Sequence, residues 1–262
     1  MSVVSTGSKL SRISVEIEDA IARITLRNPP LNVIDMQMMD EFAQVLEQIG
    51  RESSVVTIVI SGEGKAFSAG VDIAAHTPDH VEKMLGQFHG IVRALLATKK
   101  ITIAEVHGLC LGGGAELAMV CDLVLSSDDA EWGFPEIKLG CFPPVACTAL
   151  ASLVGQKKAA ELILTGRSVT GREAAELGLV TRSVPDIQLS SAVHIWIEQL
   201  LRLSPAALPI AKKAFYAWDS MHFDKGLARA EKIYFEDLMK TNDAHEGIRA
   251  FLDKRPPKWT GR

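Results

Sequence analysis

The first half of the chain alternates short apolar runs with longer amphipathic segments. Residues 13–27 alternate apolar and polar positions twice around Glu18-Asp19, which predicts a hairpin of two half-buried strands. Residues 55–60 form a continuous apolar run, which is typical of a strand buried on both faces, and residues 101–106 are predicted as the next buried strand. The pattern therefore predicts a sheet whose central strands are covered on both sides.

Helical patterns separate these strands. Two amphipathic helices are predicted to begin at Asp35 and at Thr77-Pro78, with Asp35 and Thr77 as N-caps. From residue 191 onward the patterns are almost all helical. Strands alternating with helices, followed by helices alone, predict an α/β core with a helical C-terminal part. The chain is accordingly divided into a tail (1–12), a core (13–190) and a helical region (191–262).

Composition and charge narrow the class of protein. The 262 residues are 47% hydrophobic and 23% charged, which is the balance of a folded globular chain and not of a disordered one. The net charge of −4 argues against a protein built mainly to bind nucleic acid. Residues 1–12 lack the apolar segment of a signal peptide, and no apolar run is long enough to span a membrane. We therefore predict a cytoplasmic protein.

The cysteines and histidines give no sign of a metal site. Cys110, Cys121, Cys141 and Cys147 form no CxxC pair and have apolar neighbours, so we predict small core residues in a reducing compartment. His76 and His80 have a spacing that can bind metal from one helix face, but no third ligand is evident. No metal is expected.

Two segments rich in small residues each follow a buried strand, at 65–73 and 108–117. The glycines at 112–114 remove side chains where a ligand could approach the backbone. Amides near Gly113 would lie at a helix N-terminus, and an amide of the first segment could point to the same place. Two such donors would form an oxyanion hole. Close packing of helix against strand explains the small residues equally well.

Two carboxylates lie near these segments in the sequence. Glu116 falls in the first turn of the predicted helix, where it either acts chemically or compensates the helix dipole. Glu136 lies between Phe134-Pro135 and Ile137, which would raise its pKa by desolvation if it is not simply a surface residue. Spacing alone does not indicate that the two carboxylates meet.

Three runs of sequence resemble one known family. KAFSAGVDI, HGLCLGGGAELAMVCDLVLSS and AEWGFPEIKLG match the crotonase (enoyl-CoA hydratase/isomerase) superfamily in order and spacing. The likeness extends from about residue 13 to residue 259. It implies an α/β fold, a spiral of β-β-α turns with a helical C-terminal trimerisation region. Such chains form trimers, which often pair into hexamers.

The resemblance also implies roles for individual residues. The amides of Val71 and Gly113 would form the oxyanion hole for a thioester oxygen, with Glu116 as base and Glu136 as acid. The substrate would be a coenzyme A ester, with no cofactor and no metal. Further substrate contacts are expected at Ala69, Asp72, Phe142, Pro143, Lys232 and Phe235, the last two toward the coenzyme of a neighbouring subunit.

One segment departs from the usual hydratase pattern. Residues 141–147 (CFPPVAC) replace a glycine-rich stretch, and two prolines stiffen them. The run PEIKLGCFPPVA resembles the cyclohexa-1,5-diene-1-carbonyl-CoA hydratases, although simple loop variation would look the same. Hydration of an enoyl-CoA is the leading hypothesis because both glutamates are present. The alternative is double-bond isomerisation or another crotonase-type reaction on an acyl-CoA, and a non-enzymatic RNA-binding or scaffold relative comes third.

Overall fold

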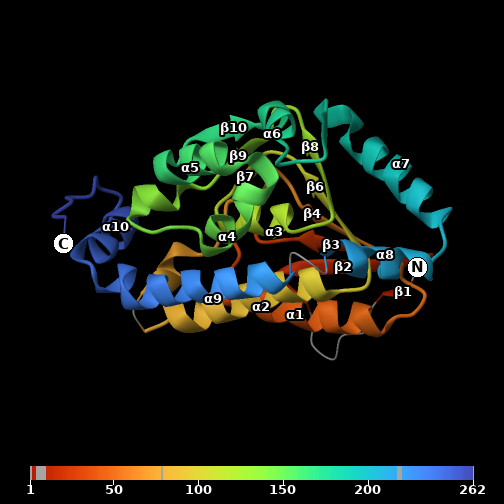
Figure 1. The fold of residues 1–262 in the computed structure, drawn as a ribbon, viewed down its shortest axis with the longest axis horizontal. Coiled ribbons are helices and arrows are strands. Elements are labelled where there is room, and N and C mark those ends of the chain that lie inside the picture. The colour runs from red at the N-terminus through yellow and green to blue at the C-terminus, as the bar shows by residue number, and fades with distance from the viewer. Residues whose placement is uncertain (1, 4–9, 78, 217–219, 262) are drawn as a thin grey trace.

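The protein is built on two β-sheets, as a computed structural model describes it for residues 2–3, 10–77, 79–216 and 220–261 (Figure 1). The larger sheet is antiparallel from β1 to β3 and parallel from β3 to β11. Its strands, in spatial order, are β1 (Ser2–Val3), β2 (Ile13–Glu18), β3 (Ile21–Leu26), β4 (Thr57–Gly62), β6 (Ile101–Val106), β8 (Leu123–Ser127) and β11 (Arg182–Val184). The hairpin and the buried strands predicted from the pattern are confirmed, with β4 starting two residues later than expected.

The smaller sheet repeats the order of the larger one. Its strands are β10 (Ser168–Thr170), β9 (Glu131–Gly133), β7 (Leu109–Leu111) and β5 (Ala66–Ser68), and the last three are parallel. Each turn of the chain adds one strand to the large sheet, one to the small sheet and then a helix. The helices that close these turns are α2 (Val81–Ala97), α3 (Gly113–Met119) and α4 (Pro144–Val154). This is the predicted spiral of β-β-α turns.

Side-chain capping determines where some helices begin. The Asp35 side chain accepts a hydrogen bond from the Met38 amide at 2.8 Å and caps α1 (Met36–Arg51), as predicted. The predicted cap at Thr77 is wrong, because α2 begins at Val81 with His80 at the N-cap position. Instead, the Thr77 backbone carbonyl accepts hydrogen bonds from the amides of His80 and Val81, in the turn before the helix. Pro78, the other residue of that prediction, lies outside the described residues.

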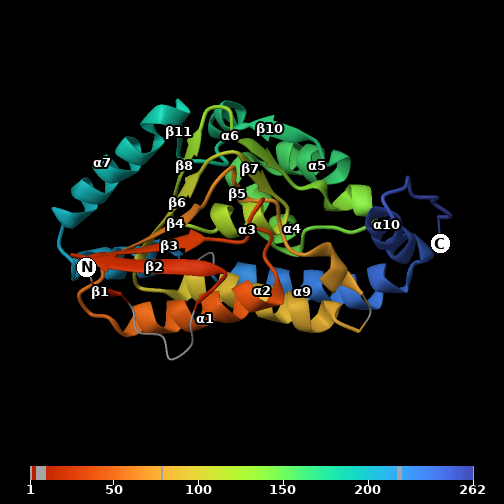
Figure 2. The same ribbon diagram turned by 180° about the vertical axis from the view of Figure 1, so that it is seen from behind.

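The C-terminal helices cover both outer faces of the spiral. They follow α5 (Gln156–Thr165) and α6 (Gly171–Leu177), and are α7 (Leu189–Leu201), α8 (Ala207–Tyr216), α9 (Ser220–Glu236) and α10 (Asn242–Leu252). Helix α7 packs against one face of the large sheet, where it buries Val193 and Ile197 against Ile103. Helix α9 lies on the other side, along α2 and α4 (Figure 2). Its residues Leu227 and Tyr234 belong to the main hydrophobic core.

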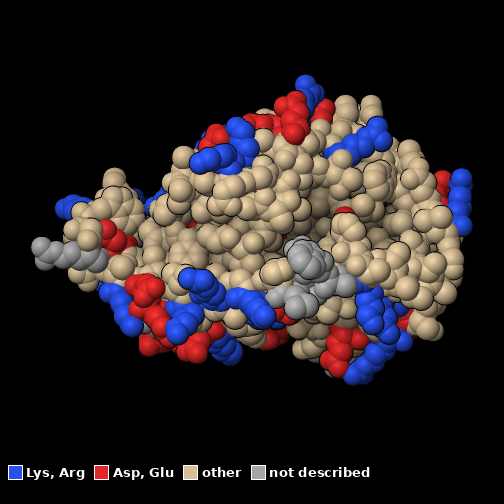
Figure 3. Space-filling model, viewed as in Figure 1, with Lys and Arg blue, Asp and Glu red and all other residues tan. Residues whose placement is uncertain are grey.

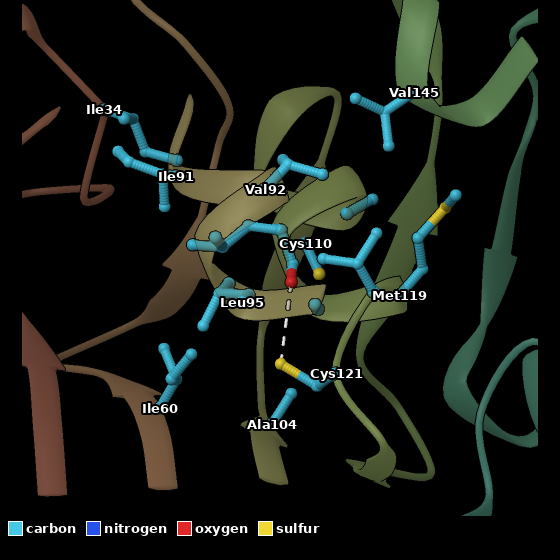
Figure 4. Packing of buried hydrophobic residues seen from close by; sticks show 14 of the residues in the cluster. Ile34, Ile60, Ile91, Val92, Leu95, Ala104, Cys110, Met119, Cys121 and Val145 are labelled. Atoms are coloured by element: carbon cyan, nitrogen blue, oxygen red, sulfur yellow. Dashed lines mark hydrogen bonds between the residues drawn. The ribbon is translucent and has the colours of Figure 1, made fainter. Parts of the chain in front are cut away.

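All four cysteines are free thiols, and three of them are buried. Cys110 and Cys121 lie in the main core among Ile91 and Leu95, with the Cys121 Sγ 3.6 Å from the Leu117 carbonyl (Figure 4). Cys141 is also buried, whereas Cys147 is exposed on α4. The prediction that all four cysteines are core residues is therefore wrong for Cys147. Among the described residues no helix is long and apolar enough to cross a membrane.

A buried ion pair anchors α8 to the large sheet. The Lys212 Nζ donates to Asp122 Oδ2 at 2.7 Å and to the Lys100 carbonyl at 2.9 Å. The same Asp122 oxygen accepts from the Thr102 amide at 2.7 Å and from the Thr102 hydroxyl at 3.0 Å. In the described structure neither charge of this cluster lacks a hydrogen-bond partner, which allows both charges to be buried.

Candidate active site

Two glycine turns bring two backbone amides together. Gly70 follows β5 with φ +105°, and Gly112 follows β7 with φ +53°, values that only glycine adopts easily. The residues after them, Val71 and Gly113, are in contact, because a Cβ added to Gly113 would lie 2.5 Å from the Val71 Cγ2. In the part of the chain described, neither amide N–H has a hydrogen-bond partner. The geometry is that of a paired donor site.

Glu116 lies in the first turn of α3, a few residues after Gly113 in the sequence. Its side chain is only 3% exposed, and its Oε1 accepts a hydrogen bond from the Ala146 amide at 2.9 Å. Burial raises the pKa of Glu116 to about 7, while the amides of Ala146 and Val145 oppose that rise. These amides stabilise the ionised form, so Glu116 is the carboxyl better suited to carry the negative charge.

Glu136 lies in the short 3-10 helix η2 (Pro135–Leu139), close to the second glycine turn. A Cβ on Gly112 would lie 2.8 Å from its Oε1, so a glycine there leaves room for the carboxyl group. Its Oε2 is buried and has no partner among the described residues. Burial and the charge of Glu116 raise the pKa of Glu136 well above its ordinary value. The pair therefore favours one carboxylate, on Glu116, and one carboxylic acid, on Glu136.

These groups line one cavity with an empty volume of about 650 Å³. Ala69, Val71, Gly113, Phe142 and Pro143 all line it, as do Glu116 and Glu136. Apolar side chains from α2, η2 and α10 form most of the remaining wall, namely Met84, Leu85, Phe88, Leu139 and Ile248. The structure thus brings together seven of the ten residues singled out from the sequence.

The other three lie elsewhere. The Asp72 carboxylate accepts from the Ala74 amide at 3.0 Å and caps the 3-10 turn η1 (Ile73–His76). Lys232 is exposed and pairs with Glu236 at 3.7 Å. Phe235 is half-buried, with its ring 6.1 Å from that of Tyr234. None of the three lines the cavity, and the contacts of Lys232 and Phe235 with a neighbouring subunit's coenzyme stay predictions.

Three further titratable residues line the cavity but had no role in the predicted active site, namely His76, Cys141 and Tyr234. The His76 Nδ1 lies 3.1 Å from the Asp72 carbonyl, and burial lowers the pKa of its imidazole. His76 was considered only as a metal ligand, and no group of three His, Cys, Asp or Glu suited to a metal is found in the described ranges. Tyr234 lies on a helix whose apolar positions read as ordinary core, so sequence spacing gave no signal for it.

Two unpartnered amides and two carboxyls line one cavity on a spiral of β-β-α turns, which is the arrangement that the resemblance to the crotonase class implies. Residues 16–262 match the family model described as enoyl-CoA hydratase/isomerase, and the chain belongs to that family. The predicted superfamily and fold are confirmed.

Similar proteins extend over almost the whole chain. A cyclohexa-1,5-dienecarbonyl-CoA hydratase of Thauera aromatica is 33% identical over 99% of this chain and 100% of its own length. A probable enoyl-CoA hydratase of Rhizobium meliloti is 37% identical over 95% of this chain and 97% of its own. The crystal structure of an enoyl-CoA hydratase from Mycobacterium avium subsp. paratuberculosis superposes with a TM-score of 0.87, at 27% identity over 96% of this chain and all of the other.

Proposed function

We propose that this protein hydrates an α,β-unsaturated acyl-CoA thioester. The observation that carries the proposal is the meeting of Glu116, Glu136 and the free amides of Val71 and Gly113 in one cavity. The two amides would donate to the thioester oxygen as negative charge develops on it. Loss of one such donor typically raises the barrier by about 3–4 kcal/mol.

The two carboxyls would divide the proton transfers between them. Glu116, whose charged form accepts hydrogen bonds from the start of α4, would take a proton from water as the water oxygen bonds to the β-carbon. Glu136, held protonated by burial and by the charge of Glu116, would deliver a proton to the α-carbon. The reaction adds one water in total and draws only on side chains and amides, so it needs no metal and no cofactor besides the substrate's coenzyme A.

For the acyl group we propose a cyclic dienoyl thioester. Support comes from the similarity to the Thauera aromatica cyclohexa-1,5-dienecarbonyl-CoA hydratase over the full chain. The cavity wall also includes aromatic rings, with Phe142 and Tyr234 packed edge to face at 5.1 Å between ring centroids. Flat aromatic walls suit a ring better than a flexible chain.

We further propose a homotrimer, alone or paired into a hexamer, in the cytoplasm. Large apolar side chains are exposed on α4 and α8, with Leu153, Ile210 and Phe215 more than 40% accessible. Figure 3 shows that charged side chains are sparse across the middle of this face and gather at its edges. Four free cysteines suit a reducing compartment. Sedimentation equilibrium should give three or six chain masses, and a monomer at micromolar concentration would contradict the assembly.

The test of the activity is a panel of linear and cyclic enoyl- and dienoyl-CoA thioesters, with products followed by mass. A gain of one water on a cyclic dienoyl thioester, with weak action on crotonyl-CoA, is the expected result. Efficient hydration of crotonyl-CoA would contradict the proposal of a cyclic substrate but would support the hydratase activity. Solvent deuterium in a shifted alkene, without added oxygen, would replace hydration by isomerisation. Salt-dependent RNA binding without any turnover would make the chain a non-enzymatic relative.

A further inference from the structure

Two buried polar atoms in the cavity have no partner in the described structure, and they lie far apart in the sequence. One is the Glu136 Oε2, and the other is the hydroxyl of Tyr234 on α9. Tyr234 is 1% exposed and lines the same cavity as both glutamates. An unpaired buried hydroxyl destabilises the folded protein, so a group kept this way is expected to meet a ligand.

The ring of Tyr234 is held firmly in place. It packs against Phe142 at 5.1 Å and against Phe235 at 6.1 Å between centroids, both edge to face. One turn earlier on α9, Glu231 accepts from His89 Nδ1 at 2.7 Å and from Arg93 Nη2 at 3.0 Å, both on α2. These contacts anchor the helix beside the cavity, so the hydroxyl cannot readily turn away to find water elsewhere.

The Tyr234 hydroxyl can donate a hydrogen bond, and the cavity that it lines also holds the carboxyl groups of Glu116 and Glu136. Burial, together with the Cys141 thiol and the carboxyls of Glu136 and Glu116, raises the pKa of Tyr234 well above its ordinary value. The O–H therefore stays protonated throughout the working pH range. The Cys141 thiol lies beside it but is a weak acceptor and does not meet the geometry of a hydrogen bond. Tyr234 lines the same cavity as both carboxyls, so the phenol borders the space in which the water would react.

We propose that Tyr234 contacts the reacting oxygen, donating a hydrogen bond to the water that is added and to the β-hydroxyl of the product. This rests on the proposed hydration. A water that donates its two hydrogens to the glutamates keeps two lone pairs. One attacks the β-carbon and the other accepts from Tyr234, so no further group is needed and no proton leaves the phenol. Tyr234 thereby orients the attacking lone pair.

The first experiment compares Tyr234→Phe with Tyr216→Phe, since the chain has only these two tyrosines. Tyr216 lies at the end of α8 and does not line the cavity. On a thioester that the wild type hydrates, Tyr234→Phe should lower kcat roughly tenfold, the usual effect of one lost hydrogen bond in a buried site. The inhibition constant of a saturated analogue, butanoyl-CoA or cyclohexanecarbonyl-CoA, should stay within about twofold, because the analogue has no reacting oxygen.

Other outcomes overturn the proposal. An unchanged kcat removes any contact with the reacting oxygen. A parallel loss of kcat and of analogue binding assigns Tyr234 a packing role, and an equal loss in Tyr216→Phe makes the effect nonspecific. If the wild type hydrates no thioester, the proposed function fails, and Tyr234 is then tested by binding alone. Wild type should then bind 3-hydroxybutanoyl-CoA more tightly than butanoyl-CoA, and Tyr234→Phe should lose that preference while Tyr216→Phe keeps it. No preference in the wild type, or its survival in Tyr234→Phe, overturns the assignment.

Discussion

Two buried polar clusters join the C-terminal helices to the spiral, and they differ in how completely their atoms are paired. Around Asp122 and Lys212, each charge has hydrogen-bond partners from the sheet or from α8. Around Glu116 and Glu136, one carboxyl oxygen and the Tyr234 hydroxyl have none in the described chain, and the pKa values of both glutamates are raised. Both clusters are largely shielded from solvent, so burial alone does not separate an anchor from a site.

The difference in pairing does separate them. A paired buried cluster holds helices in place, because breaking it leaves a charge without a partner. An unpaired one weakens the fold, and in a cavity a bound ligand can supply the missing partners. Variants of the two clusters should therefore move different quantities, activity in one case and stability in the other.

The largest effect is expected from the glutamates. Glu116→Gln and Glu136→Gln should each lower kcat by roughly 10²–10⁴-fold, since each removes one proton transfer while preserving side-chain shape. The measurement is turnover on the thioester that the wild type hydrates, with circular dichroism to verify folding. Full activity in either variant would remove that residue from the mechanism.

The anchor should respond in the opposite way. Lys212→Met leaves Asp122 buried without its counter-ion and should lower the free energy of unfolding by roughly 3–5 kcal/mol. Turnover per folded molecule should change less than about twofold. Urea denaturation measures the first quantity, and Lys213→Met, at the exposed neighbouring position, is the matched control. A large loss of turnover in folded Lys212→Met would erase the contrast between the clusters.

A third test uses pH, because Glu116 has a raised pKa in the folded protein. Its ordinary value is 4.5 and its folded value is about 7, so the stability it contributes is complete below pH 4.5 and is lost as pH rises to about 7. The loss amounts to about 3 kcal/mol. Glu116→Gln should lack this slope and be the more stable protein at pH 8. Denaturation curves from pH 4.5 to 8 measure it, and parallel curves for both proteins would contradict the raised pKa.

The smallest effect concerns His89, whose cluster is only partly paired. Its Nδ1 meets Glu231 at 2.7 Å beside Arg93, while its Nε2 is buried without a partner in the described structure. Burial lowers the pKa of His89 below 6.5, so its contribution is complete above that pH and is lost as pH falls further. This slope is opposite to that of Glu116. His89→Gln should reduce the pH dependence of the free energy of unfolding below pH 6.5, by less than the change expected for Glu116→Gln. If denaturation curves below pH 6.5 are the same for both proteins, the imidazole does not titrate in that range.

Local features of the site could be predicted from the sequence, and long-range ones could not. The run Gly112–Gly114 is readable because only glycine tolerates that backbone beside a carboxyl group, and Glu116 follows from its place in the helix. The meeting of Glu116 with Glu136 came from family resemblance, since spacing does not encode it.

The fold divides in the same way. Strand runs such as residues 101–106 and caps such as Asp35 depend on neighbours in the chain and were predicted correctly. Tyr234 was missed because its apolar ring reads as helix core, and only the docking of α9 places its hydroxyl in the cavity. Thr77 was misplaced because its carbonyl, rather than its side chain, organises the turn before α2.

The two prolines at the start of α4 affect the unfolded chain as well as the folded one. Pro143 and Pro144 have no N–H, so the amides that reach Glu116 are those of Val145 and Ala146. Each proline also restricts the conformations open to the denatured polypeptide, which typically favours folding by about 0.4–1 kcal/mol. The segment that receives a buried carboxylate thus loses less entropy on ordering than a glycine-rich one would. Part of the cost of keeping an acid and a base out of water is offset by a denatured state that has less freedom to lose.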